Sequence, residues 1–408
     1  MTNFLHGIEI IEINDGARPI KTVRSSVIGL VGTAPQGFVN TPTLITGSRK
    51  QAVEIFGANN DANKDYTIPK ALDGIFDQAG AMVVVINVAD PDNVAHLTNG
   101  NLDPTKITAS DIIGGVDAIT NEYKGVHALL SANTIIKVTP RILIAPGFTH
   151  DMTDDGSGNT LANPVVSELL AISESLRAII IADLPNSNDT DAISYVSHFG
   201  SARIYPIYPW VKIMDSNNNI IEEPASARIA GLIAKSDNDR GFWYSPSNQI
   251  INGIVGISKP IDFVLGDVNS KANYLNENNI ATIIQESGFR LWGNRTLSAD
   301  PKWAFLQARR TADMINDSLL KAHLWAVDRN ITKTYIEDVL EGVNNYLRHL
   351  KSIGAIIGGT AFADPELNTP DQIAQGKVSF DFDFTPPYPA EHITFISKMT
   401  DDYLSEIV

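Results

Sequence analysis

The plainest alternation of apolar and polar positions lies near the C-terminal end of the sequence. Apolar side chains alternate there with one serine and two aspartates, and they are Val378, Phe380, Phe382 and Phe384. This period of two predicts a strand with one buried face and one acidic face. A second β-prone run, 393–396, follows a proline-rich turn, and we expect it to fold back on the first run as a hairpin. Two strands alone are marginally stable in water, so this pair needs further partners.

A second isolated extended segment lies at the opposite end, over residues 4–13. Its alternation changes phase between Ile10 and Ile11, so both faces of the predicted strand carry apolar side chains. No run close to it in sequence could pair with it. We therefore expect this segment to insert into a sheet elsewhere, as an arm.

Between these ends, predicted strands alternate with predicted helices. The strands, with their following turns, are expected at 26–35, 43–46, 82–88, 141–147, 178–182 and 202–211, and the helices at 48–57, 68–78, 165–177 and 192–199. Several strands are continuous apolar runs, which is typical of strands covered on both faces. Repeated βα units predict a doubly wound, mostly parallel sheet.

Two long helices dominate the C-terminal third. The first is expected to begin at Pro301 and to carry a narrow stripe of mostly small residues, at Ala308, Ala312, Ile315, Leu319, Ala322 and Ala326. The second is signalled by a capping box from Thr334 to Glu337 and is expected to stop at Gly354. Its basic end carries Arg348 and Lys351, which complement the helix dipole and project outward.

The predicted fold is therefore α/β: a doubly wound, mostly parallel sheet domain plus an α+β C-terminal domain, with extended N- and C-terminal strand arms. The expected division is an N-terminal arm and linker at 1–25, an α/β outer part at 26–270, a C-terminal inner domain at 271–398 and a C-terminal arm at 399–408.

Composition narrows the classes of function. The chain has 47 acidic and 31 basic residues and a formal charge of −16, the wrong sign for a surface that grips nucleic acid phosphates. It has no cysteine, which excludes disulfides and a thiol nucleophile. No apolar run is long enough to cross a bilayer, and the first residues lack the pattern of a signal peptide. We expect a protein made in the cytosol, with no membrane insertion and no direct contact to nucleic acid.

A search for chemical motifs predicts no catalytic residue, cofactor or metal. The turn 29–33 lacks the ending of a phosphate-binding loop, and neither a His-Glu-x-x-His helix nor a Gly-x-Ser-x-Gly turn is present. The acidic stretch 150–162 superficially suggests a calcium loop, but Thr153 stands at the third position and Ala162 at the twelfth, where a carboxylate is required. A solvated surface loop is the favoured interpretation. A serine, histidine and aspartate triad could still converge in space, since triads need no local spacing.

Several long runs resemble contractile tail sheath proteins. These runs are 224–248, then 275–298 followed by 322–328, and near the N-terminus 6–20 and 28–34, which look like the shorter, P2-like branch of that family. The matches come in the right order and cover the chain essentially end to end.

The resemblance implies a structural subunit and no enzyme. In such systems, rings of six subunits stack around an inner tube, and arms donate strands to sheets of neighbours. Contraction needs no nucleotide and drives the tube through a target cell envelope. Implied partners are other copies of the chain in a helical polymer, the inner tail tube protein, and baseplate and tail terminator proteins. The implied place is a virion tail or an extracellular contractile particle, assembled in the bacterial cytoplasm.

The resemblance also assigns roles to residues. The expected subunit interface comprises apolar residues of both arms and of the predicted strand, namely Phe4, Ile8, Ile10, Ile11, Ile13, Val378, Phe380, Phe382, Phe384, Phe395, Leu404 and Ile407. The expected tube-facing residues are Arg348 and Lys351.

Two other classes remain as alternatives. One is a hydrolytic enzyme, because the α/β part of sheath proteins has been likened to a subtilisin-type fold, although fold does not carry function. The other is a monomeric binding module for a sugar or receptor. Whether the particle is a phage, a headless bacteriocin or another injection system stays open at this point.

Overall fold

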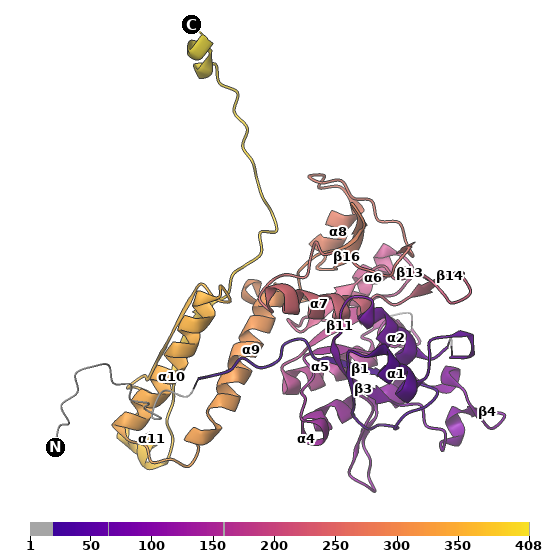
Figure 1. Ribbon diagram of the computed structural model, residues 1–408, viewed down its shortest axis with the longest axis horizontal. Coiled ribbons are helices and arrows are strands. Elements are labelled where there is room, and N and C mark those ends of the chain that lie inside the picture. The colour runs from indigo at the N-terminus through magenta and orange to yellow at the C-terminus, as the bar shows by residue number, and fades with distance from the viewer. Residues whose placement is uncertain (1–18, 64, 158–159, 408) are drawn as a thin grey trace, which may run out of the picture.

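The protein is described by a computed structural model that covers residues 19–63, 65–157 and 160–407. The predicted arm residues Phe4, Ile8, Ile10, Ile11 and Ile13 lie outside the described residues. Figure 1 shows two packed bodies, a larger one with the central sheet and a smaller one built around two long helices. We call residues 26–297 the α/β body and residues 306–385 the helical body.

A six-stranded sheet forms the centre of the α/β body. Its order is β12-β11-β8-β1-β3-β2, and all neighbours are parallel except β2 and β3. The strands are β1 (Ile28–Gly32), β2 (Thr43–Thr46), β3 (Met82–Asn87), β8 (Ile142–Ile144), β11 (Ile179–Asp183) and β12 (Ile204–Ile207). The predicted mixed α/β fold with a mostly parallel sheet is therefore confirmed.

Helices cover both faces of this sheet. On one face, α1 (Arg49–Phe56), α2 (Thr67–Phe76) and α7 (Ser226–Arg240) share a core with Leu30 and Val85. On the other face, α3 (Ala109–Ile113), α4 (Ala132–Ile136), α5 (Pro164–Leu176) and α6 (Asp189–Val196) share a core with Val31 and Val84. Because neighbouring strand residues point to opposite faces, covering both faces requires the continuous apolar runs seen in the sequence.

The α/β body also contains several small sheets. They are β13 (Val211–Met214), β14 (Ile220–Glu223) and β15 (Gly256–Ile257), the hairpin of β16 (Thr282–Gln285) and β17 (Phe289–Trp292), and the two-residue hairpins β4 (Leu97–Thr98) with β5 (Asn101–Leu102), β6 (Gly115–Val116) with β7 (Tyr123–Lys124), and β9 (Thr153–Asp154) with β10 (Thr160–Leu161). The strand expected at 202–211 is therefore two strands in two sheets. The acidic stretch considered as a calcium loop forms the exposed hairpin of β9 and β10.

The chain from α8 (Lys271–Glu277) onward still packs on the α/β body. Leu275, Ile280 and Leu297 belong to one of its cores, and Ile283 and Leu291 to the other. Leu306 also belongs to a core of the α/β body, whereas Ile315 belongs to the core of the helical body. Side-chain packing therefore changes between these two residues, and the sequence places the start of the inner domain earlier, at 271. The domain ranges themselves stay a prediction.

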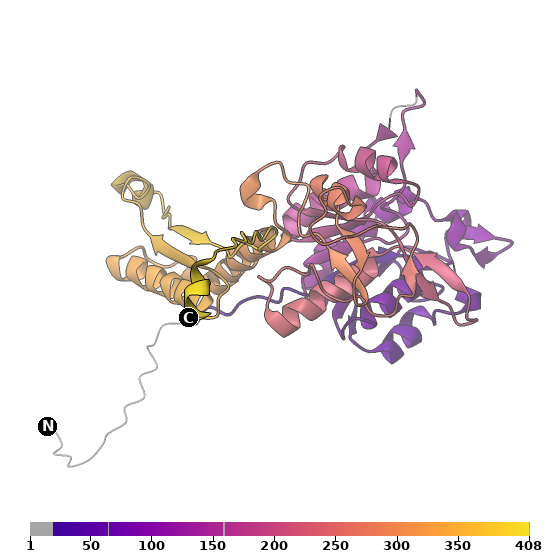
Figure 2. The ribbon, with the colours of Figure 1, turned by 90° about the horizontal axis from the view of Figure 1, so that it is seen from above.

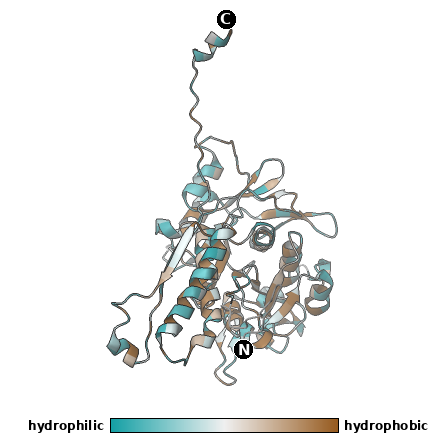
Figure 3. Ribbon diagram, turned by 60° about the vertical axis from the view of Figure 1, so that its left-hand side comes forward, coloured by the Kyte–Doolittle hydropathy of each residue, from teal (hydrophilic) through white to brown (hydrophobic). Residues whose placement is uncertain are grey.

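The helical body contains α9 (Leu306–Ala322), α10 (Lys333–Ser352), β18 (Gly358–Phe362), α11 (Pro370–Ala374) and β19 (Asp381–Thr385). Its core lies between α9, α10 and the two strands, and includes Ile315, Val343, Leu347 and Leu350. Figure 3 shows the difference in hydropathy, with apolar strands in the α/β body and polar outward faces on the long helices.

The boundaries of both long helices differ from the sequence prediction. Pro301 begins a short 3₁₀ turn, η5 (Pro301–Trp303), and α9 starts only at Leu306; after α9, a second turn, η6 (Leu324–Ala326), contains Ala326. The cap of α10 is Thr332 and not Thr334, because the Thr332 side chain accepts a hydrogen bond from the Tyr335 backbone N–H at 3.1 Å.

The predicted hairpin between 378–384 and 393–396 is wrong within this chain. The partner of β19 is β18, in antiparallel register with Ala361 opposite Phe382. Figure 2 shows these two strands beside the long helix. After β19 the chain has no helix or strand until the turn η7 (Asp402–Ile407), and Figure 1 shows it leading away from both bodies.

Candidate assembly surfaces

The predicted apolar face of the β19 region is largely a core surface of its own chain. Phe380, Phe382 and Phe384 are half-buried and pack against the core between α9 and α10, while Val378 is half-buried before the strand. The period-two pattern thus identified a buried face correctly. What it did not identify was the partner of that face, which is α10 from the same chain.

The C-terminal segment, which we define as residues 392–407, exposes apolar side chains along its length. Phe395 is 92% exposed and Met399 is 96% exposed. The other exposed apolar residues of the segment are Ile393, Ile396, Tyr403, Leu404 and Ile407. Because exposed apolar surface of this extent marks interaction sites, this segment is the strongest candidate for contact with another protein chain.

The root of this segment, residues 386–391, is held on the rest of the protein. The Arg295 guanidinium makes a bidentate ion pair with the Glu391 carboxylate, with Nη2–Oε2 at 2.6 Å and Nε–Oε1 at 2.8 Å. The same guanidinium lies over the Phe305 ring, 5.4 Å from its centroid, and Phe305 contacts the Tyr388 ring. The Glu391 carboxylate raises the pKa of Arg295. The chain is therefore anchored up to Glu391 and leaves the surface after it.

Backbone pairing explains why Arg295 and Phe305 lie together. They face each other across an antiparallel bridge, flanked by hydrogen bonds from Leu306 N–H to Asn294 C=O and from Thr296 N–H to Ala304 C=O. The chain leaving β17 thus pairs with the chain entering α9.

The first described residues are anchored as well. Thr22 and Tyr346 share a hydrogen bond between their hydroxyls at 3.0 Å, and the Val23 N–H donates to the Ser318 hydroxyl at 3.0 Å. Ile20 packs on the core of the helical body. Figure 1 shows this linker crossing from the helical body to the α/β body. The described residues next to both predicted arms are thus fixed on their own chain.

A buried network of charges joins the two bodies through α9. Asp313, whose side chain is only 2% exposed, pairs with Arg203 at 2.7 Å and with Arg309 at 2.8 Å. One turn later, Asp317 pairs with Arg177 at 2.8 Å and also with Arg141.

The same helix makes a second buried link on its N-terminal half. Arg310 holds Asp237 of α7 through two hydrogen bonds, at 2.8 and 2.5 Å. Asp237 also accepts a hydrogen bond from the Ser25 hydroxyl at 2.7 Å, so this link includes the N-terminal linker. Buried charges are tolerated only when paired and hydrogen-bonded, as here.

The sequence prediction missed this network. It treated α9 as a helix with a small-residue stripe and left its charged positions unassigned. One available signal was the spacing of Arg309, Asp313 and Asp317 at intervals of four, which places them on one face of the helix.

The predicted tube-facing residues lie near the end of α10. Arg348 and Lys351 are both exposed, and Arg348 donates a hydrogen bond to the Asn345 side-chain oxygen. Within the described part of the chain, neither side chain forms an ion pair. Their contact with a tube stays a prediction.

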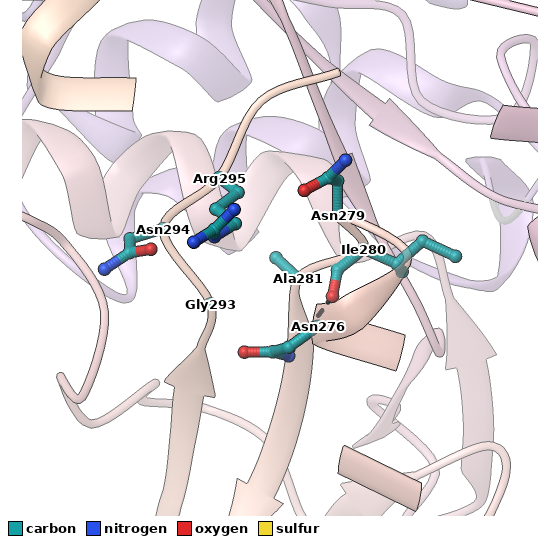
Figure 4. A pocket seen from close by; sticks show the side chains of 7 residues that line it. All are labelled: Asn276, Asn279, Ile280, Ala281, Gly293, Asn294 and Arg295. Carbon is teal, nitrogen blue, oxygen red and sulfur yellow. Dashed lines mark hydrogen bonds between the residues drawn. The ribbon is translucent and has the colours of Figure 1, made fainter. Parts of the chain in front are cut away.

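The pocket shown in Figure 4 carries no catalytic arrangement. It is lined by amide and guanidinium groups with no nucleophile, from Asn276, Asn279, Ile280, Ala281, Gly293, Asn294 and Arg295. Among the described residues, no group of three or more histidines, cysteines and carboxylates could hold a metal ion.

The triad that the sequence left open also finds no support at the buried Ser226, which is paired with a carboxylate. Ser226 donates both its hydroxyl and its N–H to Asp183. No histidine of the described chain hydrogen-bonds to either residue.

In the ranges that the structure describes, no helix has the length and apolar character needed to cross a membrane.

Comparison with protein families gives three matches along the chain. Residues 25–88 match the tail sheath protein Gp18 domain III N-terminal region, residues 105–297 the phage tail sheath protein central domain, and residues 298–400 the phage tail sheath C-terminal domain.

Relatives match over nearly their whole length. A putative prophage major tail sheath protein of Pseudomonas aeruginosa (strain UCBPP-PA14) is 41% identical over 100% of this chain and 99% of its own. The tail sheath protein of Escherichia phage P2 is 33% identical over 100% of this chain and 98% of its own. These matching families and relatives are structural proteins of tail sheaths and not enzymes.

Solved structures share the fold at lower identity. The helical sheath of the anti-feeding prophage in its contracted state has a TM-score of 0.69 at 22% identity, covering 98% of this chain and 100% of that one. The contracted sheath complex of the extracellular contractile injection system PVC has a TM-score of 0.67 at 18% identity, covering 99% of both chains.

Proposed function

Because the chain belongs to the contractile tail sheath family, we propose that its copies form rings of six that stack around an inner tail tube and are joined by strand exchange between neighbours. Contraction of this sheath then drives the tube through a target cell envelope. The particle is a phage tail or an extracellular contractile particle, assembled in the bacterial cytoplasm, with baseplate and tail terminator proteins at its ends.

One observation carries the proposal: the C-terminal segment exposes its apolar residues while its root is anchored. An apolar strand held away from its own chain has unpaired N–H and C=O groups, which a sheet edge of a neighbour can satisfy. A hydrogen bond contributes only about 0.5 to 1.5 kcal/mol net. Repetition around and between rings makes the sum of such links durable.

Deleting each arm tests this proposal. A chain lacking residues 4–13, or one lacking residues 392–408, should stay folded and soluble, because the described bodies bury their cores without those segments. Neither chain should polymerise, whereas the full chain should form tubes that electron microscopy detects. Unfolding of either truncated chain would show that the arm belongs to its own core, and tubes formed by both would contradict strand exchange.

The tube contact is proposed for Arg348 and Lys351. Both are exposed cations on one end of α10, suited to weak and salt-sensitive pairing with acidic groups of a tube that must later slide. Changing both to glutamate should block extended sheath around the tube and still allow empty contracted sheath. If the double variant forms normal extended tails, these residues do not contact the tube and only complement the helix dipole.

A further inference from the structure

We propose that residues 22–25 form a clasp that carries mechanical load. The clasp passes a pull on the N-terminal end of the described chain to α7, α9 and α10, and so protects β1 from it. This inference rests on the proposed strand exchange, which would supply the pull. It adds the path that the force takes inside one copy of the chain.

The linker leads directly into β1, which has a parallel partner strand on each side. Residues 26–27 alone separate Ser25 from this strand. At the entry to β1, the Val27 carbonyl accepts hydrogen bonds from the Arg141 N–H at 2.8 Å and the Ile142 N–H at 3.1 Å. A pull that reached Val27 would therefore act first on one shared acceptor and then on the centre of the sheet.

The first point of the clasp lies on the two long helices. The Val23 N–H donates to the Ser318 hydroxyl of α9 at 3.0 Å, and the Thr22 hydroxyl shares a hydrogen bond with that of Tyr346 on α10, also at 3.0 Å. The side chains on both helices are buried. The Ser318 hydroxyl donates its own proton to the Met314 carbonyl, so its oxygen is oriented to accept from the linker. Because these two bonds hold neighbouring linker residues, they share a pull.

The second point of the clasp is a buried ion pair between α9 and α7. Arg310 and Asp237 are joined by two hydrogen bonds, and their side chains are almost fully buried. Ser25 bonds to both partners, because its hydroxyl donates to Asp237 at 2.7 Å and its carbonyl accepts from Arg310 at 3.2 Å. Hydrogen bonds to ionised groups are stronger than those between neutral groups. Ser25 is therefore held firmly through its side chain and its backbone together.

The two points act in series between the arm and the sheet. Figure 1 shows the linker passing from α10 across α9 to the α/β body. Ile20, near the start of this path, packs on the core of the helical body. A pull on Pro19 therefore reaches residues 22–23 first and Ser25 next, and it reaches Val27 only after the bonds to three helices.

α9 returns the diverted force to the α/β body at a different place. Its Asp313 pairs with Arg203, and its Asp317 pairs with Arg177. These two arginines stand immediately before β12 and β11. Arg203 also donates to the Ala178 carbonyl at 3.1 Å. The force thus enters the sheet beside two strands at once, through buried side chains, and not through the end of β1.

Mechanical unfolding of single molecules tests the inference without any assembly. The chain has no cysteine, so introduced cysteines provide unique attachment points. One pair, Pro19→Cys with Tyr274→Cys, directs the pull through the clasp. A second pair, Ile119→Cys with Tyr274→Cys, lies wholly in the α/β body and bypasses the linker. The three replaced residues are exposed.

Three hydrogen-bonding side chains are removed in the clasp variant, which carries Thr22→Val, Ser25→Ala and Ser318→Ala. It leaves the pair of Arg310 and Asp237 intact. A milder variant carries Ser25→Ala alone. The matched control removes three side-chain hydrogen bonds outside the linker, with Thr98→Val, Ser187→Ala and Ser258→Ala.

Under a constant pull through residue 19, we expect the time before unfolding to fall about tenfold or more in the clasp variant and about threefold in Ser25→Ala. The matched control should change it little. When the pull bypasses the linker, the parent and the clasp variant should unfold equally slowly.

Equal times for parent and clasp variant under a pull through residue 19 would overturn the clasp. An equal loss in both pulling directions would overturn it too, because that result marks a general loss of stability. Electron microscopy of the parent decides the proposed function separately. A parent that forms no polymers would overturn that function and remove the source of the pull, whereas the unfolding times still show whether residues 22–25 carry load.

Discussion

Asp183 is a completely buried carboxylate at the end of β11, where its partner is Ser226 at the start of α7. Burial raises the pKa of Asp183 from 3.8 to about 6, although hydrogen bonds from Ser226 oppose the shift. Because the folded state holds this proton more tightly than the unfolded state, the associated stability is fully present below pH 4 and is lost as pH rises through 6. The total effect is about 3 kcal/mol.

Asp183→Asn should remove this pH dependence while keeping an acceptor for the Ser226 N–H. Urea unfolding of the arm-deleted chain should show that the variant gains about 1 kcal/mol relative to the parent between pH 5.5 and pH 7.5. All other titrating groups are shared and cancel in this difference. A difference independent of pH would show that Asp183 does not titrate in this range.

Asp313 makes one of the buried ion pairs that link the two bodies. It faces both Arg203 and Arg309 in a site with almost no solvent. Asp313→Asn should destabilise the chain by about 3 kcal/mol, because it removes the one carboxylate that Arg203 and Arg309 share in a buried site and leaves Arg203 with Glu174 alone. Chemical denaturation measures the loss.

The control for this change is Glu337→Ala, which breaks an exposed pair with Lys333 on α10. Surface pairs contribute little, so the control should change the unfolding free energy by less than about 1 kcal/mol. Equal effects of the two variants would contradict the role assigned to the network.

At the scale of elements, the cap of α10 distinguishes two neighbouring threonines. Thr332 accepts from the Tyr335 N–H, whereas the sequence favoured Thr334 because Glu337 completes a capping box with it. Thr332→Ala should therefore cost about 1 kcal/mol of stability. Thr334→Ala should be close to neutral, and thermal unfolding of both variants compares them. A larger loss at Thr334 would restore the original assignment.

Elements with a strong period or a continuous apolar run could be predicted from sequence. The strands of the central sheet are of this kind, and Ser48 and Gly57 mark the ends of α1 as expected. β18 was missed, because Gly358 and Gly359 lack side chains that could show a period. Its selection as the partner of β19 depends on α10, which no local pattern reveals.

At the scale of the whole molecule, the sequence showed that apolar segments lie at both ends of the chain. It did not show which contacts fix the residues next to these segments on the folded protein. Phe395 and Ile407 are apolar in a region without a local partner, and that is visible in sequence. The pair of Arg295 and Glu391 joins residues 96 positions apart, and charges of that kind carry no periodic signal. Assembly surfaces could therefore be predicted as segments, and their geometry required the folded chain.

The Arg295 and Glu391 pair should direct the arm rather than stabilise the fold. Both side chains are more than a third exposed, so breaking the pair should leave the melting temperature of the chain nearly unchanged. Arg295→Glu should nonetheless place two carboxylates together and release residues 386–391 from the surface. Cleavage of those residues by a nonspecific protease should become faster, and the yield of polymers should fall.

The exchanged pair, Arg295→Glu with Glu391→Arg, provides the decisive comparison. It restores opposite charges at the same positions, so it should recover much of the protease resistance and of the polymer yield that the single variant loses. The recovery will be incomplete, because the guanidinium then no longer lies over the Phe305 ring, where it now makes a cation–π contact. If the single variant assembles as well as the parent, the anchored root does not set the path of the arm, and the segment beyond Glu391 finds its neighbour unaided.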